Sequence, residues 1–232
     1  MSRLPDGALT RADGPASAAE VLPGVAWEES RTPLAEHLYP AEVEHLARAV
    51  TKRREEFETV RGCARRALRR LGVDRAEMVP GPGGEPAWPP GCVGSMTHTA
   101  GYCAAAVTTR SHVLSLGIDA EANEPVPDDI LDLFASPRER TLVSDLAARS
   151  APVAWDRVLF SAKESVYKTW YPVLGTWLGF NDVAVQLETS GTFTVELTNP
   201  DRGEDGAQLL ARLQGRWRVL GGHIVTGALI LP

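Results

Sequence analysis

Apolar side chains recur at helical spacing in two long stretches of this chain, residues 40–71 and 155–174, and strand-like segments follow each stretch. Positions three and four apart share one face of a helix, so both stretches can bury a continuous apolar face. The segments that follow are short apolar or alternating runs between turn residues, which is typical of antiparallel strands. They are residues 101–109 and 113–118 in the first half, and 193–198, 212–217 and 223–231 in the second. This order predicts an α+β fold of two pseudo-symmetric halves, 1–117 and 118–232, each a helix packed on a small antiparallel sheet.

Glycine, proline and polar clusters predict the connections between these elements. Pro40 suits the first turn of the first helix and Gly72 its end, while a break near Thr51 would make two helices of it. We expect residues 1–24 to be a loose lead-in, residues 80–92 and 119–127 to be loops, and residues 130–146 to form a further helix.

Composition excludes several classes of protein. The 232 residues are 44% hydrophobic and 23% charged, which is ordinary for a globular chain and excludes a disordered one. No apolar run reaches membrane-spanning length, so we expect no membrane insertion. The net charge of −6 opposes nucleic-acid binding. Three cysteines without metal-ligand spacing, and the lack of an apolar N-terminal leader, favour a reduced, cytoplasmic protein.

Positive charge is concentrated in the first helical stretch. Between Arg48 and Arg70 there are nine basic and three acidic residues, a net +6 within a chain whose total is −6. A solvated helix face explains such a run. Arginine also binds phosphate through two parallel hydrogen bonds, so the run would equally suit a small polyanionic ligand.

Three carboxylates and a lysine form a candidate cation and phosphate site. Asp119 and Glu121 follow an apolar strand and, two apart in extended backbone, point to the same side. Glu164 and Lys168 are four apart on the second helix and share a face. Carboxylates with few histidines nearby favour a hard cation such as Mg²⁺, which bridges to substrate phosphate. Loop solvation and an ordinary surface ion pair would explain the same residues.

The segment GSMTHTAG, residues 94–101, predicts a small-residue turn before the next strand. Its hydroxyls, its backbone N–H groups and His98 are groups that commonly accompany a bound phosphate. A purely structural histidine is the alternative. Gly83 and Gly84 do not begin a P-loop, because no Gly-Lys-Ser/Thr follows them.

Three segments taken together, GSMTHTAGY, GIDAE and FSAKESVYK, resemble the surfactin/enterobactin-type (Sfp/EntD superfamily) 4'-phosphopantetheinyl transferases in order and spacing. KRREEFETVRGCAR and GEPAWP resemble the actinobacterial branch, and the likeness covers residues 52–180. The resemblance implies that coenzyme A binds in a cleft between two pseudo-symmetric halves. It implies transfer of the phosphopantetheine arm to a serine of a carrier protein, with release of 3',5'-ADP.

The resemblance also implies a role for each matched residue. Asp119, Glu121 and Glu164 would bind Mg²⁺, and Lys168 would assist departure of the ADP phosphate. Either Glu164 or a water oriented by Glu164 and the metal would accept the serine proton. Contacts to coenzyme A would come from Arg53 and Arg61 on the 3'-phosphate, from Ser95 and Thr97 in the same pocket, and from Lys163 and Lys168. His98 would contact phosphate and belong to the catalytic set with Glu164 and Lys168. Tyr167, Trp170 and Tyr171 would wall the pantetheine channel, although core packing explains aromatic residues equally well.

The chain departs from the family at one place, since the family commonly has a lysine near the loop of residues 80–86 and this chain has none. We expect another residue to supply that phosphate contact, or coenzyme A to bind more weakly. A non-catalytic relic that binds carrier or coenzyme A, and a Mg²⁺-dependent nuclease, are the alternative functions.

The expected partners are acyl, peptidyl or aryl carrier proteins, which the sequence does not separate. Carrier proteins are usually acidic, as this chain is, so docking needs a local basic or apolar patch. The Arg65–Arg70 end of the basic helix is a candidate for that patch. We expect a monomer, because the resemblance places both halves of the site in one chain.

Overall fold

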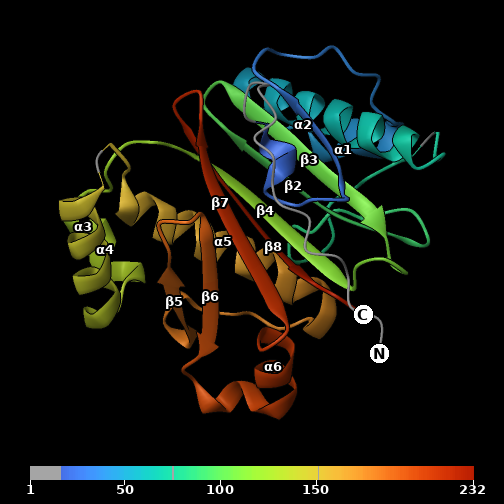
Figure 1. Ribbon diagram of the computed structural model, residues 1–232. Coiled ribbons are helices and arrows are strands. Elements are labelled where there is room, and N and C mark those ends of the chain that lie inside the picture. Colours follow the sequence, from blue (N-terminus) through green and yellow to red (C-terminus); the bar gives the residue numbers. More distant parts are fainter. Residues whose placement is uncertain (1–16, 75, 151) are drawn as a thin grey trace.

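Two antiparallel sheets form the centre of the molecule, and a long helix packs on each of them (Figure 1). The computed structural model describes residues 17–74, 76–150 and 152–232. The first sheet has the strand order β1 (Ala26–Ser30), β3 (Tyr102–Thr109), β2 (Cys92–Thr99). The second has the order β4 (Ser115–Ala122), β8 (His223–Ile230), β7 (Leu213–Leu220), β6 (Thr192–Leu197), β5 (Val183–Leu187). The predicted α+β class with two antiparallel sheets is confirmed.

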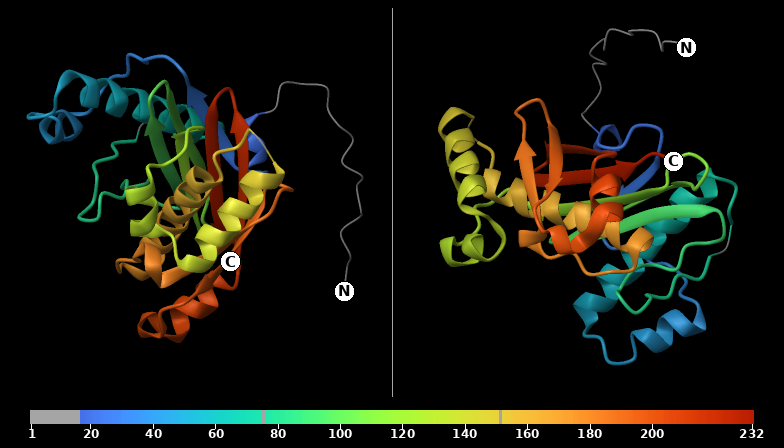
Figure 2. Two further views of the ribbon diagram at one scale, coloured as in Figure 1. Left: turned by 90° about the vertical axis from the view of Figure 1, so that its left-hand side faces the viewer. Right: turned by 90° about the horizontal axis from the view of Figure 1, so that it is seen from below.

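Each long helix buries one apolar face on its own sheet. Helix α2 (Thr51–Arg70) packs Ala67 and Leu68 against Val107 of β3, and helix α5 (Trp155–Leu174) packs Val166 against Ile224 of β8. The shorter helices are α1 (Pro40–His45), α3 (Asp128–Phe134), α4 (Pro137–Arg149) and α6 (Gly203–Leu210). Short 3₁₀ turns span Ala18–Glu20, Phe180–Asp182 and Pro200–Arg202. Helix α4 packs on α5 and β5 at the end of the molecule far from α2 (Figures 1 and 2).

The two sheets meet at β2 and β4, where side chains take the place of a backbone ladder. The Ser95 hydroxyl accepts the N–H of Ile118 at 3.1 Å, and the Thr97 hydroxyl accepts the N–H of Ala120 at 3.1 Å. Residues two apart on β2 thus bond residues two apart on β4, as the strand period requires. This junction fixes the strand that carries Asp119 and Glu121 against the strand that carries His98.

Two segments predicted as turn or loop are strands. Residues 94–99 belong to β2, and the turn comes after them, at Gly101 with φ 71°. Residues 119–122 extend β4, because Asp119 and Glu121 pair with Thr226 and Ile224 of β8. Ser95 and Thr97 of β2 accept N–H groups of β4, and Asp119 of β4 accepts from Thr97, which a local pattern does not reveal. The predicted division between 117 and 118 falls inside β4 and stays a prediction.

The helix predictions are confirmed for residues 155–174 and refined elsewhere. Residues 40–71 form two helices, since the chain breaks between α1 and α2, and Gly72 follows the second with φ 77°. The segment predicted as one helix at 130–146 is also two, because Pro137 starts α4 with Ser136 as its N-cap.

Several elements have no counterpart in the sequence predictions. They are β1, β5 and α6. The predicted loose lead-in is wrong for residues 17–24, where Ala18, Val21 and Leu22 are buried, and its residues 1–16 lie outside the described residues. Among the helices of the described ranges, none has an apolar stretch long enough to cross a membrane.

Candidate active site

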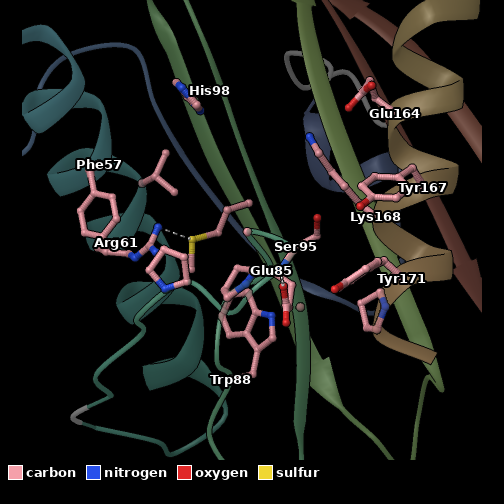
Figure 3. A pocket seen from close by; sticks show the side chains of 18 of the residues that line it. Phe57, Arg61, Glu85, Trp88, Ser95, His98, Glu164, Tyr167, Lys168 and Tyr171 are labelled. Atoms are coloured by element: carbon pink, nitrogen blue, oxygen red, sulfur yellow. Dashed lines mark hydrogen bonds between the residues drawn. The ribbon is translucent and has the colours of Figure 1, made fainter. Parts of the chain in front are cut away.

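A cavity of about 270 Å³ lies between α2 and α5, with β2 behind it and the loop of residues 80–88 below (Figure 3). Helix α2 contributes Arg53, Glu56, Phe57, Val60 and Arg61 to its walls, and α5 contributes Glu164, Tyr167, Lys168, Tyr171 and Pro172. Strand β2 adds Gly94, Ser95, Met96 and His98, and the loop adds Pro80, Gly83, Gly84, Glu85, Pro86 and Trp88. The cavity therefore draws its walls from both helical halves of the chain.

Arg61 places a buried positive charge at the α2 wall. Its Nε and Nη2 donate to the Met78 carbonyl at 3.1 and 2.9 Å, and its Nη1 donates to the Met96 sulfur at 3.3 Å. The guanidinium lies 3.8 Å from the centre of the Phe57 ring. An arginine has five N–H donors, so within the described residues these contacts use three of them and include no carboxylate.

The charge state of Arg61 follows from this setting. Burial lowers the pKa of Arg61 to about 10, with Arg65 and Arg53 acting in the same direction and Glu42 opposing them. The side chain remains a cation at neutral pH. A buried cation without a directly bonded anion is poorly compensated, which favours an anion in the adjoining cavity.

His98 lies on β2 between a cation and an anion from α2. Arg53 Nη1 is 2.8 Å from its Nε2, and Glu56 Oε2 is 3.4 Å from the same atom. Burial, followed by the charge of Arg53, lowers the pKa of His98, and Glu56 only partly offsets this. The ring is therefore neutral near pH 7, with Nε2 accepting from Arg53.

Glu164 and Lys168 face the cavity from α5, opposite Arg61 of α2 (Figure 3). Lys168 Nζ donates to Asp119 Oδ1 at 2.7 Å and to the Ile118 carbonyl at 3.2 Å. Asp119 also accepts from Thr97 and, at 2.8 Å, from Ser161. Hydrogen bonds thus hold Asp119 and Lys168 in place.

The carboxylates of Glu121 and Glu164 are raised in pKa, chiefly by burial, and the negative charge of Asp119 acts in the same direction on both. Arg157 approaches Glu121 to 3.5 Å. The Glu164 carboxylate has no hydrogen-bond or ion-pair partner in the described ranges. Its carboxylate is thus left for a proton or a ligand that enters the cavity.

Three mutually repelling carboxylates suit a hard divalent cation, and the donor chemistry of Asp119, Glu121 and Glu164 fits Mg²⁺. In the described part of the chain, no three His, Cys, Asp or Glu side chains are already arranged as a metal site. Lys168 and Arg157 instead neutralise two of the carboxylates. The residues fit the ion by the chemistry of their oxygen atoms.

Aromatic side chains wall the lower part of the cavity, and two glycines let them approach. A Cβ on Gly83 would lie 2.3 Å from the Tyr171 ring, and one on Gly94 would lie 2.7 Å from the Trp88 ring. Only glycine permits such close contact. Tyr167 lies next to Tyr171, with ring centres 5.8 Å apart. This aromatic end of the cavity, which also holds the Glu85 carboxylate, contrasts with the end at His98 and Glu164 (Figure 3).

Several predicted site residues lie elsewhere. Lys163 is buried and does not line the cavity, because its ammonium bonds Glu139 at 2.9 Å and the carbonyls of Phe134, Phe180 and Val183. The predicted phosphate contact at Lys163 is corrected accordingly. Thr97 is likewise buried, between β2 and β4.

Two further corrections concern α5 and α2. Trp170 lies in the core and not in the channel wall, with its indole N–H donating to Thr176. Arg65 is buried against Glu42 at 2.6 Å, so it is not part of an exposed docking patch. Arg66, Arg69 and Arg70 remain exposed at that end of the helix.

Three further residues shape the site without having been predicted from the sequence. Glu56 contacts His98, Trp88 forms part of the floor, and Glu42 anchors the network behind Arg61. Glu42 had a local signal, since it stands two residues after the helix-initiating Pro40. Trp88 lies in the quoted segment GEPAWP, but no periodicity marks it.

Comparison with known proteins identifies the family of the chain. Residues 41–108 match the model for the 4'-phosphopantetheinyl transferase N-terminal domain, and residues 115–219 match that for the 4'-phosphopantetheinyl transferase superfamily. The chain is 48% identical over 190 residues to 4'-phosphopantetheinyl transferase Svp of Streptomyces mobaraensis, covering 82% of this chain and 77% of that protein.

Two more relatives align along most of their length. PptT of Mycobacterium tuberculosis is 42% identical over 229 residues, which cover 91% of this chain and 97% of PptT. Npt of Nocardia iowensis is 40% identical over 196 residues, which cover 81% of this chain and 87% of Npt. Both carry the name 4'-phosphopantetheinyl transferase. Because the family models match both halves and these relatives align over most of the chain, the protein belongs to the Sfp/EntD-type 4'-phosphopantetheinyl transferases, with similarity to their actinobacterial members.

Proposed function

We propose that the cavity between α2 and α5 is the coenzyme A site of a transferase that moves the 4'-phosphopantetheine arm onto a serine of apo acyl, peptidyl or aryl carrier proteins. One observation carries the proposal: the same cavity has a buried guanidinium at one wall and the Glu164–Lys168 pair at the other. Membership of the transferase family supports this function over a nuclease.

The α2 wall holds the phosphates of coenzyme A. Arg61 offers N–H groups that the described residues leave without an acceptor, and it takes the 3'-phosphate together with Arg53. His98 and Ser95 line the same cavity and add phosphate contacts. The pantetheine arm lies along the apolar wall of Trp88, Tyr167 and Tyr171. This arrangement leaves the pyrophosphate opposite α5.

Glu164 accepts the proton of the carrier serine. The serine oxygen attacks the phosphorus that bears pantetheine, a new P–O bond forms, and the bond to 3',5'-ADP breaks. The electron pair of that bond leaves on the ADP phosphate oxygen, which Lys168 stabilises by hydrogen bonding. Glu164 suits a base because its carboxylate lies in the cavity opposite Arg61, and burial raises its pKa above the ordinary glutamate value.

Asp119, Glu121 and Glu164 would hold a Mg²⁺ ion. When bound, this ion would neutralise charge on the pyrophosphate oxygens. Hydrogen bonds from Thr97 and Ser161 keep Asp119 in place when Lys168 turns to the leaving phosphate. Because α2 and α5 of one chain supply both walls, we propose that the two halves form one catalytic unit and that the enzyme is a monomer. The cytoplasmic location stays a prediction.

Titration calorimetry of Mg²⁺ into the complex with coenzyme A tests the metal assignment without relying on turnover. We expect Asp119→Asn and Glu121→Gln each to weaken Mg²⁺ binding by about tenfold or more, since each removes a charged oxygen ligand. Glu188→Gln, at an exposed position in the turn after β5 and outside the cavity lining, is the matched control and should bind Mg²⁺ as the wild type does. Equal Mg²⁺ affinity in all four proteins would refute the carboxylate site.

A further inference from the structure

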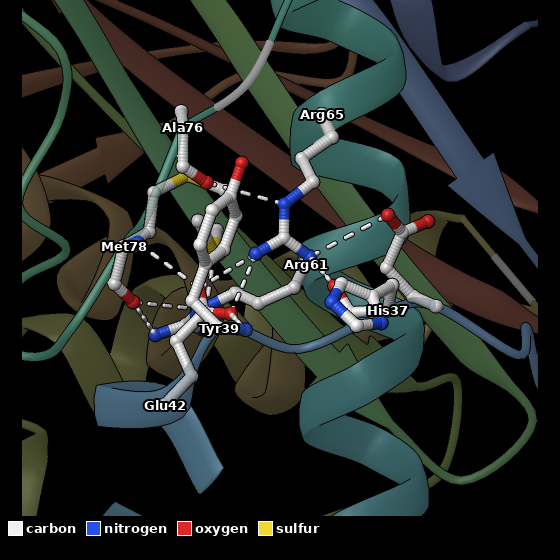
Figure 4. Close-up of polar contacts among 9 residues, drawn as sticks. His37, Tyr39, Glu42, Arg61, Arg65, Ala76 and Met78 are labelled. Carbon is white, nitrogen blue, oxygen red and sulfur yellow. Dashed lines mark hydrogen bonds and ion pairs between the residues drawn. The ribbon is translucent and has the colours of Figure 1, made fainter.

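A buried carboxylate outside the cavity, Glu42 of α1, holds together the structure behind Arg61 (Figure 4). Its side chain is fully buried. Oε1 accepts the N–H of Met78 at 3.0 Å, and Oε2 accepts the N–H of Tyr39 at 2.9 Å. Both oxygens also accept from Arg65 Nη2, at 2.8 and 2.6 Å. Every contact donates to Glu42, so the site requires a group that only accepts.

Met78 connects this carboxylate directly to Arg61. Its N–H donates to Glu42, and its carbonyl accepts both Nε and Nη2 of Arg61. One turn along α2, Arg65 Nε bonds the carbonyl of Ala76. Arg65 and Arg61 thus donate to the carbonyls of Ala76 and Met78, two residues apart in one segment. Glu42 accepts the Met78 N–H, which lies between these two carbonyls along the chain (Figure 4).

The segment that Glu42 fixes continues into the cavity wall. From Met78 the chain leads through Pro80 and Gly83 to Trp88, all three of which line the cavity. The orientation of the Arg61 fork depends on where the Met78 carbonyl lies, because two of its three described hydrogen bonds end there. A shift of this peptide would therefore redirect the N–H groups that face the cavity.

We propose that Glu42 is a positioning residue for coenzyme A, which fixes the Met78 peptide and through it aims Arg61 at the 3'-phosphate. This inference rests on the proposed assignment of Arg61 to that phosphate. Glu42 does not line the cavity. Its effect should therefore fall on affinity for ligands that carry the 3'-phosphate and not on the reacting groups of α5.

The Glu42→Gln substitution keeps the size of the side chain but alters its hydrogen bonding. A glutamine amide has one acceptor oxygen and an NH₂ group that only donates. One of the backbone N–H groups of Tyr39 and Met78 then faces a donor, and Arg65 loses the countercharge that lies against it. Glutamine thus accepts only one of these two N–H groups, and Arg65 keeps, among the described residues, only the carboxylate of Glu36, 3.5 Å from its Nη1. Both changes loosen the segment that carries the Met78 carbonyl.

The chain contains a matched control for this change. Glu139 of α4 is also buried and has the same position in its helix as Glu42, with a proline two residues earlier. It accepts N–H groups of Ser136 and Val185 and pairs with Lys163, as Glu42 accepts N–H groups of Tyr39 and Met78 and pairs with Arg65. None of these three partner groups lines the cavity. Glu139→Gln therefore disturbs an equivalent network at another site.

The test compares coenzyme A with dephospho-coenzyme A, which lacks the 3'-phosphate, as substrates for transfer to one apo carrier protein. Wild type should prefer coenzyme A, and Arg61→Met should lose that preference. We expect Glu42→Gln to raise KM for coenzyme A about tenfold, the size of effect of a hydrogen bond to a charged group, while KM for dephospho-coenzyme A and kcat stay within about twofold. Glu139→Gln should retain the wild-type preference even if it lowers Tm.

The outcomes separate the two proposals. A Glu42→Gln enzyme that keeps the full preference, while Arg61→Met loses it, overturns the role of Glu42 alone. An Arg61→Met enzyme that keeps the preference overturns the phosphate assignment and the inference with it. If Glu42→Gln does not fold, Glu42→Asp keeps the charge but shortens the reach to Met78, and it should show a smaller shift of the same kind. An unchanged preference in Glu42→Asp, beside an Arg61→Met enzyme that loses it, likewise overturns the inference.

Discussion

Arg61 and Arg65 lie one helical turn apart on α2, yet only Arg65 bonds a carboxylate within the described residues. Arg65 sits against Glu42, and its other hydrogen bonds go to the carbonyls of Ala76 and His37. Arg61 has carbonyl and sulfur acceptors and opens into the cavity. Arg65, which is paired with a buried carboxylate, therefore stabilises the fold. Arg61, which has no carboxylate partner in the described ranges and lines the cavity, is available to bind a ligand.

This difference predicts that the same substitution, arginine to methionine, acts mainly on stability at Arg65 and mainly on coenzyme A binding at Arg61. Arg65→Met should lower the free energy of unfolding by about 3–5 kcal/mol, because it leaves Glu42 buried without its cation. Arg61→Met leaves no carboxylate unpaired, so it should cost far less stability while sharply weakening coenzyme A binding. Urea denaturation and binding calorimetry on the two variants measure both quantities. Equal losses of stability would show that Arg61 is as structural as Arg65.

His98 predicts a pH dependence whose sign follows from its surroundings. Because burial and Arg53 lower its pKa, the folded protein binds a proton at His98 less readily than the unfolded chain does. The stability that depends on neutral His98 is present above about pH 6.5, the ordinary histidine pKa, and is lost as the pH falls through the lowered value. His98→Asn should flatten this part of the stability profile.

Coenzyme A should change the titration of His98 in the opposite direction. A bound phosphate stabilises the protonated ring, so the ligand should raise its pKa. Titration of the His98 ring followed by NMR, with and without coenzyme A, measures the change. The other four histidines, which lie outside the cavity lining, serve as internal controls. A midpoint unmoved by the ligand would contradict a phosphate contact at His98.

At the scale of elements, the close approach of β4 to α5 brings the reacting groups together. Strand β4 carries Asp119 and Glu121, and α5 carries Glu164 and Lys168. Gly117 makes the approach possible, since a Cβ there would lie 2.1 Å from the Ser165 carbonyl and 2.7 Å from the Thr169 hydroxyl. The Ser165 carbonyl belongs to the backbone of α5, so it cannot move out of the way by a rotamer change.

Gly117→Ala should therefore push α5 away from β4. We expect a loss of stability of about 1–3 kcal/mol or more from the overpacking, and slower transfer because the Lys168–Asp119 bond is displaced. Gly72→Ala is a useful control, because a Cβ there meets nothing within 4 Å and costs only the strain of φ 77°. Urea denaturation and initial rates check both effects. A Gly117→Ala enzyme as active as Gly72→Ala would contradict this account of the packing.

The sequence predicts an element well where a single apolar face determines its secondary structure. It predicts an element poorly where the hydrogen-bonding partners of that element lie in the other half of the chain. Helix α5 has the bounds that its periodicity predicts. Residues 94–99 favour a turn by composition, yet Ser95 and Thr97 accept N–H groups from β4, which no local pattern reveals. Lys163 and Lys168 are both conspicuous on α5, but five helical positions place them about 140° apart, and only Lys168 faces the cavity.

At the scale of the whole molecule, one apolar core lies across both sheets. It contains Val93 and Ala104 from the first sheet and Ile118, Val225 and Leu229 from the second. Together with the Ser95 and Thr97 bonds to β4, this core makes each half depend on the other. The site between α2 and α5 is a product of the whole chain.

This shared core predicts that the two halves unfold together. Calorimetry should show a single transition whose van't Hoff and calorimetric enthalpies agree, since neither half keeps its apolar face covered alone. Coenzyme A should raise the Tm of this single transition, by more as its concentration rises above Kd, because it contacts walls from both halves. Two separate transitions, with only one shifted by coenzyme A, would contradict a single catalytic unit.

Catalysis is tested most directly by the intact mass of an apo carrier protein after incubation with this enzyme, coenzyme A and Mg²⁺. We expect a gain of one phosphopantetheine arm, which a chelator abolishes. Glu164→Gln should lose the transfer while still binding coenzyme A, since Arg53 and Arg61 remain in place. An unmodified carrier across acyl, peptidyl and aryl types, with coenzyme A still bound to the wild-type protein, would contradict catalysis and favour a binding relic.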